Sequence, residues 1–273
     1  KKPERMRELA AQLESEAASV DAQPYFERLG QSQGMRAYLA RELAPHWIES
    51  VQIVSDPPLK WKSDDRSGWL VEPLTAMLEG ARQKALLISP YFVPGEEGSN
   101  GLKGLVAHGV SVGVVTNSLA ANDVPAVHSG YARYRERLLR DGVSLHEMKA
   151  RTQVDSSGVF GSSGASLHTK AFVVDDTRGF VGSFNLDPRS VDLNTEMGVL
   201  FEDAALAREL RNEYLRLARP DLSYWVYLDG EGRLRWLDWS EAPPLVYSTE
   251  PDASLMRRLL VAVLGLLPIE SQL

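Results

Sequence analysis

The chain has 273 residues, 44% of them apolar, which is enough for one large core or two small ones. It contains no cysteine, so structural disulfides and thiolate metal sites are excluded. The net charge of −7, from 30 basic and 37 acidic residues, argues against a broad basic surface for nucleic acid. No apolar run reaches the roughly 20 residues that a membrane-spanning helix needs.

The first 50 residues are expected to be helical. Pro3 to Ser19 carries apolar residues at helical spacing, which predicts a charged amphipathic helix that Pro24 ends. Gln31 to Gly34 is predicted to be a loop, and Met35 to Leu43 a second helix. Because the chain lacks an initiator Met and a signal-peptide pattern, we expect it to begin inside a longer gene product.

From residue 51 onward, strand and helix patterns alternate along the chain. The predicted strands are Val51–Val54, Ala85–Ser89, Val110–Thr116 and Val143–Met148, and the predicted helices are Ser67–Gln83, Leu102–His108 and Pro125–Arg140. Alternation of this kind predicts an α/β fold with a mixed β-sheet flanked by helices on both faces. The Gly-Glu-Glu-Gly run at 95–98 is flexible enough in composition to act as a lid over a site.

The segment from Leu167 to Phe184 predicts a β-hairpin. Leu167 to Val174 is rich in β-branched and aromatic residues, Asp175 to Gly179 is a polar turn, and Phe180 to Phe184 is the return strand. Side chains alternate along a strand, so His168 and Lys170 point to the same face about 7 Å apart. An imidazole beside an ammonium suits an anionic phosphate, which the ammonium neutralises while the imidazole attacks phosphorus or transfers a proton.

The same segment resembles the signature of the phospholipase D superfamily, which is H-x-K, four residues, D, six residues, and G-S-x-N. The matching residues are His168, Lys170, Asp175, Gly182, Ser183 and Asn185, with every spacing kept. The resemblance implies a phospholipase D-like fold and a phospho-histidine mechanism in which His168 is nucleophile or acid. It implies that Lys170, Ser183 and Asn185 hold phosphate.

The resemblance assigns two carboxylates to the catalytic group. Asp175 would support the geometry of the histidine and lysine, and Glu196, 28 residues after His168, would accept a hydrogen bond from that histidine. A metal site formed by the carboxylates of Asp155, Asp175, Asp176 and Glu196 is not expected, because their spacing matches no ligand motif. A site made of Lys, His and Asn does not require a metal, so neither metal nor cofactor is expected.

Two loops after predicted strands look like matching segments of bacterial cardiolipin-synthase-like phosphatidyltransferases. Pro90 to Gly95 contains Tyr91, and the stretch from Thr116 to Tyr131 contains Asn117 and His128. Ligand loops tend to lie at the carboxyl ends of strands, so these three side chains are candidate substrate contacts. A structural turn is the alternative for the first loop, and a structural histidine is the alternative for His128.

The candidate contacts end with Arg189, just after the signature. Its guanidinium suits a second phosphate, held bidentately, and pairing with a neighbouring acid is the alternative. Further on, the predicted elements are a strand at Met197–Phe201, a helix at Ala204–Leu217 and a hairpin of Tyr224–Leu228 with Leu234–Leu237. The apolar segment Ser254 to Ile269 suits either a membrane interface or docking in the core, and both interpretations stay open.

The lipid-synthesising relatives implied by this resemblance carry two copies of the signature, whereas this chain carries one. The other four histidines, His46, His108, His128 and His146, stand in no H-x-K. The chain therefore resembles the second half of a two-copy enzyme. On this interpretation residues 1–50 connect to a missing N-terminal half, residues 51–250 form the phospholipase D-like domain, and residues 251–273 are an apolar C-terminal helix.

The main hypothesis is phosphatidyl transfer or hydrolysis on phospholipids, with this chain supplying one of two half-sites. The expected partners are a phospholipid, a second H-x-K from the missing half or another copy, and the cytoplasmic face of a bacterial inner membrane as a peripheral contact. A homodimeric nuclease and a non-catalytic half-domain are the alternatives. The acidic balance and the lipid-enzyme-like loops argue against the nuclease. The headgroup and the acceptor alcohol do not follow from the sequence.

Overall fold

A computed structural model describes residues 2–17, 19, 36–37, 39–42, 46–63, 65–150 and 167–273. The chain divides into two compact units, Lys1–Trp47 and Ile48–Leu273. In the first unit, α1 (Lys2–Ala17) matches the predicted amphipathic helix. The predictions for Pro24, for Gln31 to Gly34 and for Asp155 fall outside the described residues.

The second unit is built on a mixed sheet, which in the described part has ten strands in the order β1-β7-β6-β5-β2-β3-β4-β8-β9-β10. The strands are β1 (Ser50–Ser55), β2 (Lys84–Ile88), β3 (Ser111–Asn117), β4 (Ser144–Met148), β5 (Lys170–Val174), β6 (Arg178–Gly182), β7 (Met197–Glu202), β8 (Ser223–Leu228), β9 (Leu234–Asp238) and β10 (Leu245–Tyr247). Neighbours β2, β3 and β4 run parallel, and the other neighbouring pairs are antiparallel.

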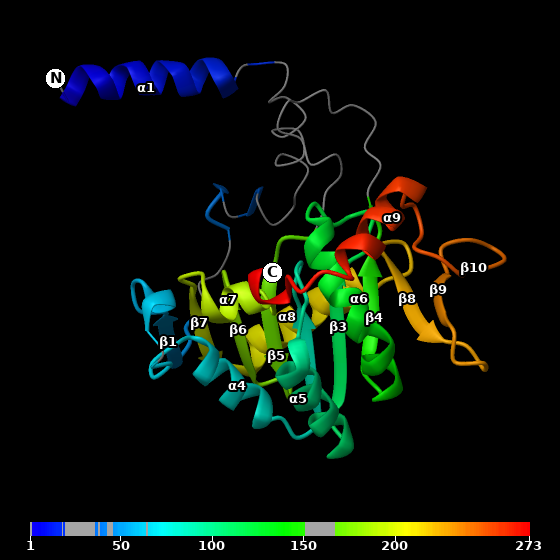
Figure 1. The fold of residues 1–273 in the computed structure, drawn as a ribbon. Helices are drawn as coiled ribbons and strands as arrows, with labels where there is room; N and C mark the ends of the chain where they lie inside the picture. Colours follow the sequence, from blue (N-terminus) through cyan, green and yellow to red (C-terminus); the bar gives the residue numbers. More distant parts are fainter. Residues whose placement is uncertain are drawn as a thin grey trace. The chain divides into compact units, whose positions relative to one another are not determined.

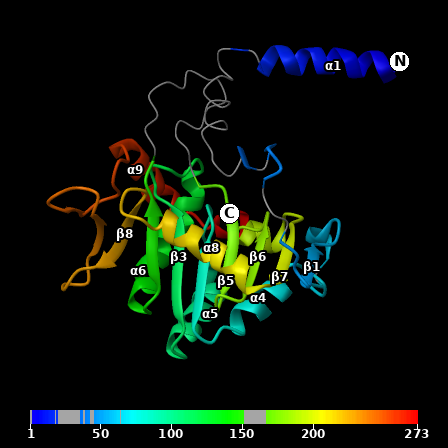
Figure 2. The same cartoon turned by 180° about the vertical axis from the view of Figure 1, so that it is seen from behind.

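Helices cover both faces of this sheet, as predicted. One face carries α4 (Val71–Glu79), α5 (Gly95–Ala107) and α6 (Pro125–Arg140), which stand in front of the strands in Figure 1. The other face carries α8 (Ala204–Leu217), seen in front of the strands in Figure 2. Shorter elements are the 3-10 turns η1 (Lys60–Lys62) and η2 (Glu270–Gln272), with helices α7 (Pro188–Asp192) and α9 (Leu255–Leu264).

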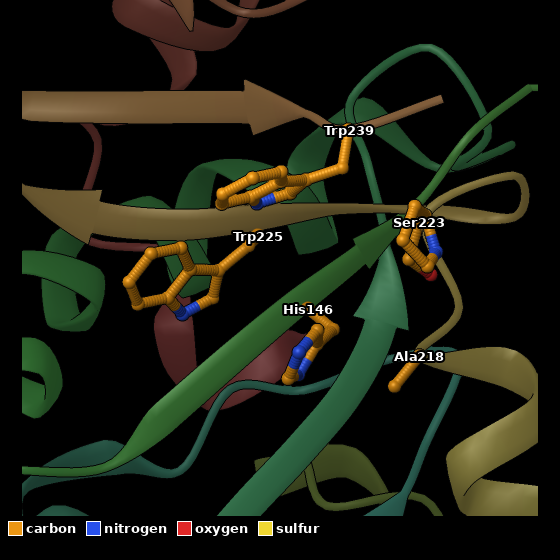
Figure 3. Close-up of a pocket in the computed structure, with 6 residues that line it drawn as sticks. His146, Ala218, Ser223, Trp225 and Trp239 are labelled. Atoms are coloured by element: carbon orange, nitrogen blue, oxygen red, sulfur yellow. The ribbon is translucent and has the colours of Figure 1, made fainter. Parts of the chain in front are cut away.

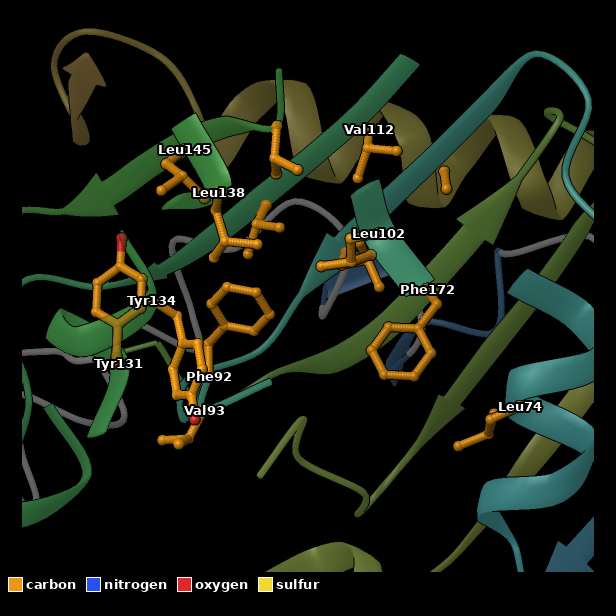
Figure 4. Packing of buried hydrophobic residues seen from close by; sticks show 14 of the residues in the cluster. Leu74, Phe92, Val93, Leu102, Val112, Tyr131, Tyr134, Leu138, Leu145 and Phe172 are labelled. Carbon is orange, nitrogen blue, oxygen red and sulfur yellow. The ribbon is translucent and has the colours of Figure 1, made fainter. Parts of the chain in front are cut away.

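Strand β5 is buried on both sides, and its alternating side chains enter two different hydrophobic clusters. Phe172 and Val174 join the cluster beneath α4, α5 and α6, part of which is drawn in Figure 4. Ala171 and Val173 join the cluster beneath α8. Lys170 has the same strand parity as Phe172, so it points to the face that carries α4, α5 and α6.

The turn between β5 and β6 is shorter than predicted. Asp175 and Asp176 adopt positive φ values of 53° and 56°, and the amide of Thr177 donates to the carbonyl of Val174 over 3.1 Å. Two left-handed residues match the twist of a tight hairpin, and aspartate tolerates that conformation better than most residues. The return strand therefore begins at Arg178 rather than at Phe180.

The prediction of a flexible lid at residues 95–98 is wrong. Helix α5 begins at Gly95, so the Gly-Glu-Glu-Gly run forms its first turn, ahead of the predicted start at Leu102. Glu96 and Glu97 lie where negative charge stabilises the helix dipole, and this outweighs the low helix propensity of glycine. Across the described ranges, no helix is long and apolar enough to cross a bilayer.

Candidate active site

The register of the sheet gathers several chain segments at one edge. Ile88 at the end of β2 pairs with Ala171 of β5, and Lys170 pairs with Gly182 at the end of β6. Gly182 also pairs with Gly198 near the start of β7. We call this edge of the sheet the site edge. It contains the residues that follow β2, β3 and β6 and the residues that precede β5 and β7.

His168 and Lys170 stand at the site edge in different environments. The His168 side chain is exposed, and its imidazole makes no hydrogen bond to another described residue. Lys170 is buried, and its ammonium donates to the carbonyl of His168 over 2.9 Å. Burial lowers the pKa of this ammonium, while the carboxylates of Glu196 and Asp187, among others, act to raise it. The partly desolvated ammonium of Lys170 and the solvent-exposed imidazole of His168 together suit a phosphate oxygen.

Glu196 holds the signature serine rather than the histidine. Its carboxylate accepts hydrogen bonds from the hydroxyl of Ser183, from Ser190 Oγ at 3.1 Å and from Asn194 Nδ2 at 3.2 Å. Ser183 Oγ in turn accepts the amide of Met197 over 3.0 Å. The expected hydrogen bond from His168 to Glu196 is not formed in the described residues, because both carboxylate oxygens face these other donors.

Asn185 combines burial with an unused polar atom. The residue is 8% exposed, and its Oδ1 lies buried without a hydrogen-bond partner among the described residues. Its backbone amide donates to Ser190 Oγ over 3.3 Å, which fixes the backbone while leaving the side-chain amide unengaged. A buried amide oxygen without a donor costs free energy unless a ligand or water donates to it, so this side chain is a candidate ligand contact.

The glycine of the signature is required by close packing. A Cβ on Gly182 would lie 2.5 Å from the carbonyl oxygen of Met197 and 2.5 Å from the ring of Phe180. A Cβ on the paired Gly198 would lie 2.3 Å from the same ring. The two glycines therefore let Phe180 lie flat across β6 and β7 directly below the site edge.

Asp175 is not brought to His168 and Lys170. It follows the far end of β5, about 20 Å from His168 at the usual rise per residue. Its carboxylate accepts the backbone amides of Arg82, Gln83 and Lys84 over 2.8 to 3.2 Å. Burial raises the pKa of Asp175, but these three amides and Arg178 outweigh burial and lower it. The aspartate of the signature thus ties the hairpin turn to the segment that opens β2.

Asn117 anchors the signature strand instead of pointing to open solvent. Its side-chain amide donates to the carbonyl of Leu167 over 3.3 Å, and its Oδ1 accepts the amide of Leu167 over 3.0 Å. These two bonds fix the backbone immediately before His168. Tyr91 lies nearby and donates its hydroxyl to Asp123 Oδ1 over 2.8 Å. Burial and that carboxylate both raise the pKa of the Tyr91 phenol.

His128 belongs to a buried network under α6. Its Nε2 lies 3.1 Å from Glu250 Oε1, and Arg135 bridges Glu250 at 2.7 Å to Glu147 at 2.8 Å. Burial raises the pKa of Glu250, but the charge of Arg135 and the hydrogen bond with His128 outweigh burial and lower it. With a side chain that is fully buried, His128 fits the structural alternative. Arg189 differs, because its side chain is exposed at the site edge and makes no ion pair to a described residue.

A buried ion pair that was not predicted from the sequence contacts two segments of the site edge. Lys60 Nζ lies 2.5 Å from Asp56 Oδ2 and donates to the carbonyl of Ser190 over 2.8 Å. Asp56 also accepts the amide of Glu196 over 2.9 Å. The spacing of four residues between Asp56 and Lys60 hints at a pair, but nothing local links either residue to Ser190 or Glu196.

Two of the hollows formed by the described residues lie beside the sheet. A hollow of about 630 Å³ lies between α4, α5 and the sheet, with Phe172, Phe184 and Asp187 in its lining. Burial raises the pKa of Asp187 to about 6, although its carboxylate accepts the amide of Ser190. The other hollow, of about 320 Å³, lies on the α8 side between His146, Trp225 and Trp239 (Figure 3). In the described residues, no three metal-ligating side chains cluster together.

Comparison with known proteins identifies relatives of this chain. Residues 74–218 match the family model described as the phospholipase D-like domain of cardiolipin synthase. Cardiolipin synthase C of Escherichia coli is 38% identical over 229 residues, covering 82% of this chain and 48% of that protein. An uncharacterized protein of Helicobacter pylori is 32% identical over 185 residues, covering 67% of this chain and 36% of that protein. The chain thus spans less than half the length of both relatives.

The solved structures include a phospholipase D family member, Nuc from Salmonella typhimurium. It superposes with a TM-score of 0.48 at 17% identity and covers 65% of this chain and 98% of that chain.

Proposed function

This chain belongs to the family of phospholipase D-like domains of cardiolipin synthases, and on that premise we propose that it catalyses phosphodiester transfer or hydrolysis on phospholipids. The observation that carries the proposal is the site edge, where His168 and Lys170 stand beside Asn185. One nucleophile, one cation and one unengaged amide at a single edge match what a phosphoryl centre requires.

In the proposed reaction, a ring nitrogen of His168 attacks the phosphorus of the phospholipid. The new N–P bond forms as the P–O bond to the leaving alcohol breaks, and a second acid protonates the leaving alkoxide. An acceptor alcohol then attacks phosphorus and gives its proton to the second acid, which was left deprotonated by the first step. The N–P bond breaks and His168 is restored. When water takes the place of the alcohol, the outcome is hydrolysis.

The residues around His168 stabilise charge rather than form bonds. Lys170 neutralises the non-bridging phosphate oxygens, and its partial dehydration strengthens that interaction. Asn185 donates its side-chain amide to the same oxygens, and Ser183 joins them if its hydroxyl turns from Glu196 toward the ligand. Arg189, exposed at the same edge, is placed to pair with a second phosphate or with the phosphate of the acceptor.

The second acid has to come from outside this chain. A histidine that attacks one side of the phosphorus cannot also protonate the leaving group on the opposite side, and only His168 stands in an H-x-K. We therefore assign this chain one half-site, with residues 1–50 as the connector to another half or with a second copy as the partner. The complete enzyme would act on lipid at the cytoplasmic face of a bacterial inner membrane.

The test compares two substrates. Release of headgroup from phosphatidylglycerol vesicles is measured beside cleavage of plasmid DNA, for the natural full-length product and for this chain alone. We expect headgroup release by the full-length product, loss of release in its His168→Ala variant, and little turnover by this chain as a monomer. DNA cleavage without headgroup release would establish a nuclease instead. Inactivity of the full-length product on both substrates would indicate an inert domain.

A further inference from the structure

Helix α9 presents apolar side chains to solvent. The exposed members, which we call the α9 apolar face, are Leu255, Met256, Leu259, Leu260, Val263, Leu266 and Leu267, with exposed fractions from 43% to 84%. Their spacing follows one side of a helix and continues into the turn after it. Single exposed leucines are ordinary, but a contiguous set of this size marks an interaction surface.

The opposite side of α9 is fixed to the domain by its basic residues. Arg257 donates to the carbonyl of Asn122, and Arg258 donates to the carbonyl of Glu250 over 2.6 Å. Val261 is the buried residue on this side, and it packs with Leu119 in a small hydrophobic cluster. The helix therefore turns its charges inward and its apolar residues outward. The docking interpretation is confirmed for one side of α9, and the other side is uncovered by the described residues.

The segment from α9 to the C-terminus runs along the site edge. Asn122, which α9 contacts, follows β3 and is next to Asp123, the partner of Tyr91. Farther along, the carbonyl of Leu273 accepts the amide of Arg189 over 2.5 Å. In Figure 1 the segment passes in red from α9 to the terminus beside α7. The α9 apolar face is thus continuous with the elements that carry the candidate phosphate contacts.

The chemistry of the α9 apolar face fits a fluid apolar layer better than a protein. Its members are leucine, methionine and valine, without the Tyr, Trp or Arg anchors that dominate protein–protein interfaces. The stretch from Ala253 to Ile269 contains no acidic residue that lipid phosphates would repel. With 10 residues, α9 is about 15 Å long, too short to cross a bilayer but long enough to lie in its surface.

We infer that the α9 apolar face inserts into the surface of a phospholipid bilayer and sets the site edge at the depth of the lipid phosphates. The inference rests on the proposed function, because a phospholipid substrate must be reached in its membrane. Insertion is driven by apolar burial, so it should be insensitive to ionic strength, as expected for a chain whose net charge is −7.

The first test is co-sedimentation of the 273-residue chain with vesicles of phosphatidylglycerol and phosphatidylethanolamine at low and high salt. We expect binding at both salt concentrations and at least a tenfold loss of partitioning in the double variant Leu259→Asp, Val263→Asp. The matched control is Leu215→Asp on α8, because Leu215 and Leu259 are both 54% exposed. The control should bind within about twofold of the parent chain, and circular dichroism verifies that each variant is folded.

The second test uses the absence of cysteine in the chain. A single Leu259→Cys carries an environment-sensitive fluorophore, and its emission should shift to the blue on vesicle addition and be quenched by brominated acyl chains. The same label at Leu215→Cys should not respond. A label at Leu259→Cys that ignores vesicles would overturn the inference, as would a dimer by light scattering that the double aspartate variant dissociates. Vesicle insertion without any lipid turnover by the full-length product would instead refute the proposed function alone.

Discussion

The two ends of the β5–β6 hairpin use their polar groups in opposite ways. At the turn, the carboxylate of Asp175 is saturated by three backbone amides and lies near Arg178. At the site edge, the imidazole of His168 makes no hydrogen bond to a described residue, and the Oδ1 of Asn185 is buried and unpaired among the described residues. All three residues belong to the same signature, so a shared motif does not imply a shared role.

Hydrogen-bond partners distinguish the residues that stabilise the fold from the residues that are proposed to contact the substrate. A polar group whose partners are all within the protein lowers the free energy of the folded state and has nothing left for a ligand. A buried polar group without a partner raises the free energy of the folded state until a ligand forms a hydrogen bond with it. By this criterion the signature divides into a turn anchor and a proposed phosphate site, linked by the five residues of β5.

The largest expected effect is at the open end. His168→Ala should lower headgroup release by the full-length product on the order of 10⁴-fold, because it removes the attacking group. The melting temperature should change little, since the imidazole contacts no described residue through a hydrogen bond. Initial rates on vesicles and thermal unfolding measure the two quantities. Near-parental turnover by a folded His168→Ala variant would refute the proposal that His168, at the site edge, is the attacking group.

The next largest expected effect is the loss of a transition-state contact at Asn185. Asn185→Asp keeps the side-chain shape but replaces an amide donor by a carboxylate, and a lost transition-state donor typically costs about 10²–10³ in rate. Lys170→Ala should fall in a similar range. Steady-state kinetics should show the loss in kcat more than in KM. An Asn185→Asp variant with unchanged kcat would mean that the side-chain amide of Asn185 donates no hydrogen bond to the transition state.

At the turn the expected effect is on folding. Asp175→Ala removes the acceptor of three backbone amides and places alanine at a positive φ, so we expect a loss of about 3–4 kcal/mol in unfolding free energy. Turnover per folded molecule should fall less than tenfold. Urea denaturation and activity on the same samples distinguish the two outcomes. An Asp175→Ala variant as stable as the parent but inactive would reverse the proposed division of the signature.

The smallest effect concerns Asp187, which lines the hollow and whose carboxylate acts on the pKa of Lys170. Its pKa, raised to about 6 by burial, exceeds the unfolded value near 3.8, so the folded state holds its proton more tightly. Asp187 should therefore lower stability progressively as pH rises from about 4 to 6, by about 2–3 kcal/mol at most. Asp187→Asn keeps the α7 cap and removes the charge.

The measurement is the difference in unfolding free energy between Asp187→Asn and the parent from pH 4 to pH 7. The difference is needed because His146, whose pKa burial lowers to about 4, changes stability in the opposite sense over the same range. We expect the variant to gain stability relative to the parent as pH rises and then to level off above pH 6. A flat difference would mean that Asp187 ionises as an ordinary surface carboxylate.

The sequence alone determined most of the elements, and it supplied the candidate residues of the site edge. Strand and helix periodicity and the polar turn at Asp175 are local properties, and a local pattern is sufficient to predict them. The mixed sheet with helices on both faces followed from the alternation of elements and is confirmed by the structure. Local composition misled at residues 95–98, where the glycines suggested a lid and the acidic first turn produced a helix.

Only the tertiary structure decided the partners of the carboxylates. Asp175 meets Arg82 across 93 residues of sequence, and Glu196 meets Asp56 across 140. Such contacts depend on strand order and register, which place distant segments side by side without leaving a repeating pattern in either one. The outward face of α9 was undecided for the same reason, because an apolar stripe in sequence does not specify which of its sides the rest of the fold will cover.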